Sequence, residues 1–228
     1  MNDYVFTPSV AFPSPGATVN PLNQEPNPMK PIGELLDVLT KSQALEPLIE
    51  KTGRELVECL KRGGKLFSCG NGGSAADALH FAQELVGRYK VNRRALPAIC
   101  LNADVTAITC IGNDYGYDQI FSRQLSAFAR PGDVLVGFST SGNSPNVLAT
   151  FAVAKTLKVT TILLGGRDGG QARGRCDYEL IIPSQNTARI QEVHTLVMHS
   201  WLDQVDREFD PASAKHTSWM QQAEMALV

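Results

Sequence analysis

Residues 65–89 constrain the fold of this chain more than any other segment, because they combine a short strand, a glycine-rich turn and a new helix. Residues 65–69 (KLFSC) have the apolar character of a buried strand. The turn that follows, residues 70–73 (GNGG), lets a ligand approach the backbone closely because three of its residues lack a Cβ atom. Ser74 is expected to be the N-cap of the helix. The free N–H groups and positive dipole at such a helix start suit a phosphate or another anion.

The rest of the chain alternates between apolar runs and amphipathic segments. The runs at 65–69, 98–101, 133–139, 160–164 and 178–182 are continuous, which is typical of parallel strands covered on both faces. Helices are expected at about 75–89, 118–128, 145–157, 170–175 and 187–208, and before them helical spacing from 32 to 62 predicts one long helix or two shorter ones. This order predicts an α/β fold with right-handed crossovers and an open five-stranded parallel sheet flanked by helices. Ligands of such sheets bind beyond the carboxyl ends of the strands.

Composition excludes several classes of protein. The 228 residues carry a formal net charge of −2 without a long block of like charge, so nothing indicates a nucleic-acid partner. The local basic cluster Arg88, Lys90, Arg93 and Arg94 is expected to be solvated surface. No apolar stretch approaches the roughly 20 residues that a transmembrane helix needs, and the N-terminus lacks the pattern of a signal peptide. The five cysteines form no CxxC pair, which favours buried free thiols and a cytoplasmic protein.

Three regions divide the chain. Residues 1–31 are rich in Pro and Asn and are interpreted as an N-terminal arm. Residues 32–209 form the main domain, and residues 210–228 form a C-terminal tail.

A second candidate anion loop spans residues 139–145 (STSGNSP). Its hydroxyls, Ser139, Thr140, Ser141 and Ser144, follow a strand and precede a helix that begins at Pro145. Hydroxyl donors together with free backbone N–H groups would form a phosphate cradle. The alternative is a loop that merely caps its own helix, but one or two hydroxyls would suffice for that.

Candidate proton-transfer groups lie on two of the expected helices. His80 and Glu84 are four residues apart and share a helix face. In the last helix, Gln191 and His199 are eight residues apart, roughly 80° around the axis, so both can line one cavity. His194 is expected to be a hydrogen-bonded core residue. Taken alone, His80 and Glu84 are equally compatible with a surface pair, and His199 with a core histidine.

These residues together carry a family resemblance. The runs SCGNGGSAADALHFAQELVGRY, GNDYG (112–116), GDVLVGFSTSGNSPNV and RIQEVHTLVMH resemble the SIS (sugar isomerase) phosphosugar-binding fold, a flavodoxin-like three-layer architecture. Within it, residues 32–209 resemble the bacterial phosphoheptose isomerases, which convert sedoheptulose 7-phosphate to D-glycero-D-manno-heptose 7-phosphate and so supply heptose for surface polysaccharide. The two loops indicate only the fold, whereas the combination of His80, Glu84, Gln191 and His199 points to the isomerase.

The resemblance implies a role for each matching residue. Asn71, Gly72 and Gly73 would contact substrate hydroxyls or phosphate, Asn113 and Asp114 would bind the sugar chain, and Ser139, Thr140, Ser141 and Ser144 would hold the phosphate. Glu84 and Gln191 would also contact the substrate. A zinc ion, Zn2+, would be bound by His80, Glu84, Gln191 and His199, with Glu84 and His199 as the acid/base pair. Family members are homotetramers with active sites at subunit interfaces.

The chemistry agrees with this assignment, because exchanging a ketose and an aldose through an enediol(ate) requires one base and one proton shuttle. Zinc would polarise the carbonyl, although Gln is an unusual ligand and a Glu bound to zinc is a poorer base. Ala75 and Ala76 depart from isomerases that carry a His there.

Three alternatives remain. A non-catalytic SIS protein that binds the replication initiator DnaA would lack the equivalents of Glu84 and His199, which are present here. A sugar-phosphate-sensing regulator would carry a DNA-binding segment, and none precedes the core. An isomerase for a different phosphosugar stays open.

Overall fold

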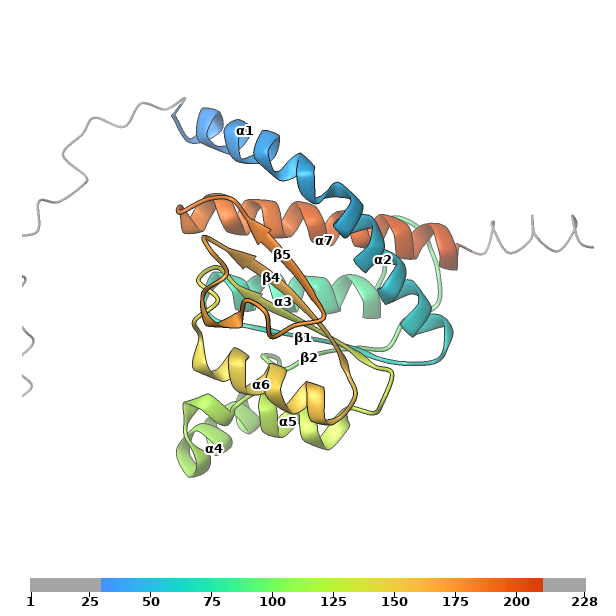
Figure 1. Ribbon diagram of the computed structural model, residues 1–228. Helices are drawn as coiled ribbons and strands as arrows, with labels where there is room; N and C mark the ends of the chain where they lie inside the picture. Colours follow the sequence, from blue (N-terminus) through green and yellow to red (C-terminus); the bar gives the residue numbers. More distant parts are fainter. Residues whose placement is uncertain (1–29, 211–228) are drawn as a thin grey trace, which may run out of the picture.

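A parallel β-sheet organises the fold in the computed structural model, which describes residues 30–210 (Figure 1). The strands are β1 (Leu66–Gly70), β2 (Ala98–Cys100), β3 (Val134–Ser139), β4 (Thr160–Gly166) and β5 (Tyr178–Ile182). All neighbouring strands run parallel, in the order β2-β1-β3-β4-β5. The predicted five-stranded α/β fold is therefore confirmed. β1, β3 and most of β4 are buried along their length, as their continuous apolar runs indicate.

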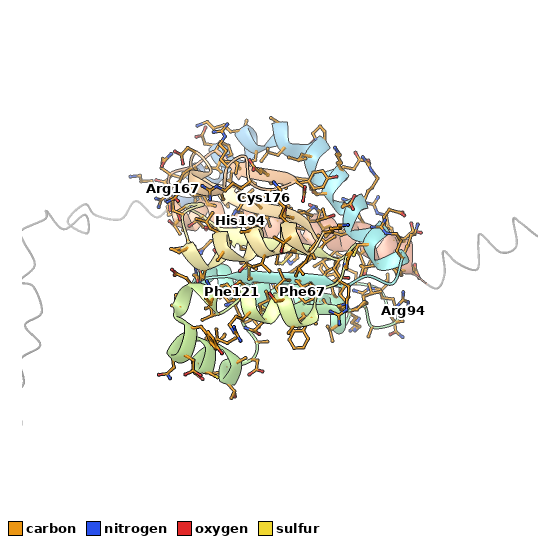
Figure 2. All side chains as sticks on the ribbon, turned by 60° about the horizontal axis from the view of Figure 1, so that its bottom comes forward. Phe67, Arg94, Phe121, Arg167, Cys176 and His194 are labelled. Carbon is orange, nitrogen blue, oxygen red and sulfur yellow. The ribbon has the colours of Figure 1, made fainter. Side chains whose placement is uncertain are left out.

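Helices cover both faces of the sheet (Figure 1). One layer contains α1 (Lys30–Ser42), α2 (Glu46–Lys61), α3 (Gly73–Val86) and α7 (Thr187–Phe209), and the other contains α4 (Val105–Tyr115), α5 (Ser122–Phe128) and α6 (Pro145–Thr156). Single 3-10 turns lie at η2 (Gln43–Leu45), η3 (Tyr117–Gln119) and η4 (Gly170–Ala172). Each layer has its own core: Trp201 and Phe81 are buried on the α7 side, and Phe67 and Phe121 on the α5 side, where Figure 2 labels them.

The strand order creates a switch point between β1 and β3. The chain leaves β1 toward β2 on one side and then crosses to β3 on the other, with Gly70 paired to Phe138 at the carboxyl ends. The loops after β1 and β3 therefore lie next to each other, where open α/β sheets bind ligands. These loops are the two candidate anion loops.

Four expectations need correction. The sequence reading did not anticipate α4, none of whose residues is buried by the rest of the described chain. Ser74 is not the N-cap of α3: Gly72 takes that position with φ 57°, and Ser74 is buried inside the helix. Cys110 is exposed, whereas Cys59, Cys69 and Cys100 are buried as expected.

The fourth correction concerns the basic cluster. Arg93 is not solvated surface, since it is 6% exposed and its Nε donates to Asp206 Oδ1 at 2.8 Å. Its guanidinium also donates to the Glu84 carbonyl at 2.9 Å, so this buried pair ties the end of α3 to α7. The predicted arm and tail lie almost wholly outside the described residues. Within residues 30–210, none of the helices has the length and apolar character to cross a membrane.

Candidate active site

The turn after β1 is shaped by close backbone packing. A Cβ atom at Gly70 would lie 2.5 Å from the Ser74 carbonyl oxygen, so only glycine fits. Gly72 adopts a left-handed φ of 57°, which glycine reaches without steric cost. Asn102, just beyond β2, holds Gly70 from the side by accepting from its N–H at 3.2 Å and donating to its carbonyl at 2.9 Å. The predicted turn at 70–73 is thus a fixed loop at the N-terminus of α3.

The hydroxyl loop after β3 is supported by its own hydrogen bonds. Ser139 Oγ accepts from Gly142 N–H at 3.1 Å and lies 3.3 Å from Ser144 Oγ. Ser141 Oγ accepts from the Asn143 N–H at 3.2 Å. Thr140 lies between them and is half-buried. Ser144 is the N-cap residue of α6, yet its hydroxyl makes no capping hydrogen bond within the described chain. The observation counts against a loop that serves only to cap its own helix.

The loop after β4, which includes residues 169–172, supports the hydroxyl loop of residues 139–145 by hydrogen bonds from its backbone. Ala172 N–H donates to the Gly142 carbonyl at 2.9 Å, and Gln171 N–H donates to Asn143 Oδ1 at 2.9 Å. A Cβ atom at Gly142 would collide with the Gly169 carbonyl. The donors of residues 139–144 are therefore preorganised, which lowers the cost of binding an anion.

Helices α3 and α7 run side by side in the same direction. A Cβ atom at Gly73 would lie 2.5 Å from Gln191 Nε2, Thr195 Oγ1 donates to Asp77 Oδ1 at 3.3 Å, and the His80 and His199 ring centroids are 5.3 Å apart. Successive turns of α3 therefore contact successive turns of α7. His199 lies next to His80, one turn before Glu84, while Gln191 lies two turns earlier on α7, next to the first turn of α3.

Glu84, His80 and His199 form the candidate acid/base cluster. Glu84 Oε1 lies 3.1 Å from His80 Nε2, and the Glu84 side chain is 17% exposed. The His199 ring is edge-on to His80 and stacks on Tyr89 at 5.5 Å between centroids. Burial and the neighbouring His80 lower the pKa of His199, against the opposing pull of Glu84. A carboxyl group and an imidazole are side chains that can pass protons to and from a substrate.

The cluster fits zinc in its chemistry but not in its spacing. Two imidazoles and a carboxylate are donor types that zinc takes in proteins. However, within residues 30–210 no group of three or more His, Cys, Asp or Glu is arranged to hold a metal ion. The Glu84 oxygen engages His80 directly, and Gln191 packs against Gly73. Metal binding by this set would require the side chains to rearrange.

Asn113 and Asp114 are at the exposed end of α4. Asn113 Nδ2 donates to Asp114 Oδ1 at 2.7 Å, and the structure brings neither side chain to the other predicted site residues. Tyr117, three residues further on, does reach the site, because its hydroxyl donates to Asn71 Oδ1 at 3.1 Å. Sequence reasoning missed Tyr117 and also Asn146, which bonds Asn71 from α6. Asn146 lies within the quoted run GDVLVGFSTSGNSPNV and Tyr117 directly follows GNDYG, but no role was assigned to either residue, because their shared partner Asn71 is 75 and 46 residues away.

Comparison with known proteins identifies the family. The model of the SIS domain matches residues 30–166. The phosphoheptose isomerase of Campylobacter jejuni is 51% identical over 172 residues, which span 75% of this chain and 92% of the relative. That of Aliarcobacter butzleri is 55% identical over 163 residues, 72% of this chain and 86% of the relative. The chain belongs to the phosphoheptose isomerase family.

Solved structures of the family agree with the architecture. The phosphoheptose isomerase of Neisseria gonorrhoeae has a TM-score of 0.73 at 41% identity, covering 78% of this chain and 95% of the other. That of Francisella tularensis has a TM-score of 0.76 at 37% identity, with the same coverage. The predicted family, fold and isomerase class are confirmed. A transcription factor domain from Sphaerobacter thermophilus, TM-score 0.58 at 15% identity, shares the fold alone.

Proposed function

We propose that this isomerase interconverts sedoheptulose 7-phosphate and D-glycero-D-manno-heptose 7-phosphate, supplying heptose for surface polysaccharide. The observation that carries the proposal is the meeting of Glu84, His80 and His199 on α3 and α7, where α3 begins at the first of two neighbouring loops suited to anions. A DnaA-binding relative would lack the equivalents of Glu84 and His199, and both are present in this cluster. Membership of a phosphoheptose isomerase family supports the seven-carbon substrate.

The phosphate would be held by the loop of residues 139–144. Ser139, Thr140, Ser141 and Ser144 supply hydroxyls, and the N-terminus of α6 adds backbone N–H groups and a positive dipole end. Asn71, Gly72 and Gly73 would contact the sugar at the adjacent loop. The remaining sugar contacts would come from Gln191, Asn113 and Asp114. The last two would reach the sugar after a rearrangement of the end of α4, or would belong to a neighbouring subunit's site.

The reaction moves one carbon-bound proton between neighbouring carbons. Glu84 takes a proton from C1 of the ketose while O2 gains one, which gives the enediol. O1 then loses its proton and C2 receives one, which gives the aldose. His199, whose ring lies next to that of His80, moves the protons on the oxygens.

Zinc forms a part of the proposal that needs its own test. His80, Glu84, Gln191 and His199 would hold the ion after the rearrangement described above, and a bound zinc would polarise the substrate carbonyl. Glu84 would then keep one oxygen free for the carbon-bound proton.

A homotetramer with active sites at its subunit interfaces is also proposed. An apolar groove between α1, α2 and α7 is lined by Leu36, Leu39, Ile49 and Leu196, and Leu36 is 60% exposed. Helix α4 adds exposed Val105 and Tyr115. Exposed apolar surface of this extent favours contact with other subunits. Light scattering at micromolar concentration should give the mass of four chains, and a monomer would contradict it.

The decisive experiment compares sedoheptulose with its 7-phosphate, using wild type and Ser141→Ala. Hydrogen bonds to a charged group contribute about 1.5–3 kcal/mol each, so the variant should raise KM for the phosphate about 10- to 100-fold. The free sugar should hardly react with either protein. Ser126→Ala, which removes a hydroxyl from α5, is the matched control and should behave like wild type. Comparable efficiency on the unphosphorylated sugar would refute the phosphosugar assignment.

A further inference from the structure

Two asparagines join the candidate anion loops by a reciprocal pair of hydrogen bonds. Asn71 Nδ2 donates to Asn146 Oδ1 at 2.8 Å, and Asn146 Nδ2 donates to Asn71 Oδ1 at 2.9 Å. Asn71 lies in the turn after β1, and Asn146 lies in the first turn of α6, where it is 1% exposed. Tyr117 of η3 donates a third hydrogen bond, from its hydroxyl to Asn71 Oδ1 at 3.1 Å. Three segments distant in sequence therefore meet at one side chain.

A backbone group fixes the direction of the whole network. The Val147 N–H donates to Asn146 Oδ1 at 2.9 Å, and since a backbone N–H can only donate, the oxygen of Asn146 must face it. The amide of Asn146 is thereby oriented, with its Nδ2 toward Asn71. Asn71 must then turn its oxygen toward Asn146 Nδ2 and the Tyr117 hydroxyl. A flipped Asn71 amide would set N–H against N–H.

Within this network the Asn71 amide keeps a free donor but no free acceptor. Its oxygen already accepts two hydrogen bonds, and one of its two N–H groups is given to Asn146. The other N–H has no partner among residues 30–210. Asn71 can therefore offer a donor to a substrate oxygen but has no free acceptor for a substrate hydroxyl.

We propose that Asn146 and Tyr117 are positioning residues. They hold Asn71 as a fixed donor and fix the position of the loop of residues 139–144 relative to the start of α3. This inference rests on the proposed function. The bridge joins α6, whose N-terminus would face the phosphate, to the loop that begins α3, which carries His80 and Glu84. Phosphate binding at one end of the substrate would thus be coupled to placement of C1 and C2 at the other. Misplacement of reacting groups by about 1 Å costs about 100-fold in rate.

The test compares two properties of Asn146→Ala with those of wild type: the turnover number and the affinity for inorganic phosphate. The hydroxyls of residues 139–144 remain, so inorganic phosphate should inhibit with a constant within about threefold of wild type. The value of kcat for sedoheptulose 7-phosphate should fall about 10- to 100-fold. Thr150→Val is the matched control, because Thr150 is fully buried on the same helix and donates to the Asn146 carbonyl at 2.6 Å, and no hydrogen bond in the described chain joins it to Asn71. It should leave kcat unchanged.

A second variant keeps the inference testable if Asn146→Ala folds poorly. Tyr117→Phe removes one exposed hydroxyl and keeps the ring, so it should fold normally and lower kcat about 3- to 10-fold, because one of two hydrogen bonds to Asn71 Oδ1 remains. With both changes, the loss should be smaller than the product of the two single losses, because both act through Asn71. Independent effects would contradict the shared role.

Other outcomes separate this inference from the proposed function. A kcat for Asn146→Ala equal to that of Thr150→Val, or a parallel loss of phosphate affinity and kcat, would overturn the positioning role. Failure of wild type to isomerise sedoheptulose 7-phosphate would instead overturn the proposed function. A crystal structure of Asn146→Ala then decides the positioning role without any activity: a rotated Asn71 amide supports it, and an unchanged one contradicts it.

Discussion

Acid should weaken the fold through one buried histidine, His194. Its Nε2 donates to the Gly165 carbonyl at 2.9 Å, and its Nδ1 is buried without a partner in the described chain. Figure 2 labels this side chain, whose ring lies 6.1 Å from the centre of the Phe138 ring. Protonation would place a charged N–H among apolar groups. Burial therefore lowers the pKa of His194 from 6.5 to about 4, against the smaller opposing effect of the Gly165 hydrogen bond.

The sign of the effect follows from this lowered pKa. Between pH 6.5 and about 4 the unfolded chain binds a proton that the folded chain does not, so stability is complete above pH 6.5 and falls as the pH drops. Each pH unit in this window removes at most about 1.4 kcal/mol, so the cost at pH 5 is about 2 kcal/mol relative to pH 7.

Urea unfolding at pH 7 and pH 5, at one fixed protein concentration, measures this cost. His194→Gln keeps a donor for Gly165 and cannot titrate. The variant should therefore lose about 2 kcal/mol less than wild type over the same interval, with other titrating groups cancelling in the difference. Equal losses in the two proteins would show that His194 takes up its proton in the folded state as readily as in the unfolded chain, and would refute the argument.

Three further predictions concern the acid/base cluster and its support. Glu84→Gln preserves an acceptor for His80 and removes the base, so turnover should fall by about 100- to 10,000-fold with sugar-phosphate binding intact; near-normal turnover would exclude Glu84 from the mechanism. Metal analysis of protein purified without chelator should find one zinc per site, absent in His80→Ala, and a metal-free active wild type would rule zinc out. Arg93→Met removes the ion-pair partner of buried Asp206, which within residues 30–210 keeps only the backbone N–H groups of Lys90 and Val91, and should cost about 3–5 kcal/mol in urea unfolding. Exposed Arg88→Met should cost less than about 0.5 kcal/mol, and equal costs would contradict the buried pair.

Most of the sheet was predictable because parallel strands carry their signal locally. The apolar runs at β1, β3 and β4 are buried on both faces, and the predicted bounds differ from the observed ones by one or two residues. Helix α4 was missed because its sequence, VTAITCIGNDY, is rich in β-branched residues, which have a lower helix propensity. Ser74 was wrongly predicted as the N-cap because Gly72, two residues earlier and at φ 57°, takes that position.

Only those parts of the site whose residues lie close together in the sequence could be predicted. The i,i+4 pair His80 and Glu84 and the helical position of His199 follow from spacing, and the structure brings these side chains together. The parallel packing of α3 on α7, which places His199 beside His80 and Gln191 beside Gly73, depends on tertiary structure. So does the burial of Arg93, whose partner Asp206 is 113 residues away. The role of Asn146 could not be predicted either, because its partner Asn71 is 75 residues away.

The central claim is that Glu84 removes a proton from C1 to give an enediol(ate), exchanges that proton with solvent and then protonates C2, and isomerisation in D2O tests it most directly. Wild type is incubated with sedoheptulose 7-phosphate and the products are followed by NMR. The account predicts heptose 7-phosphate with deuterium at C2, deuterium at C1 of the recovered ketose, and neither signal with Glu84→Gln. Heptose 7-phosphate formed without deuterium at C2, or labelled equally well by Glu84→Gln, would contradict it.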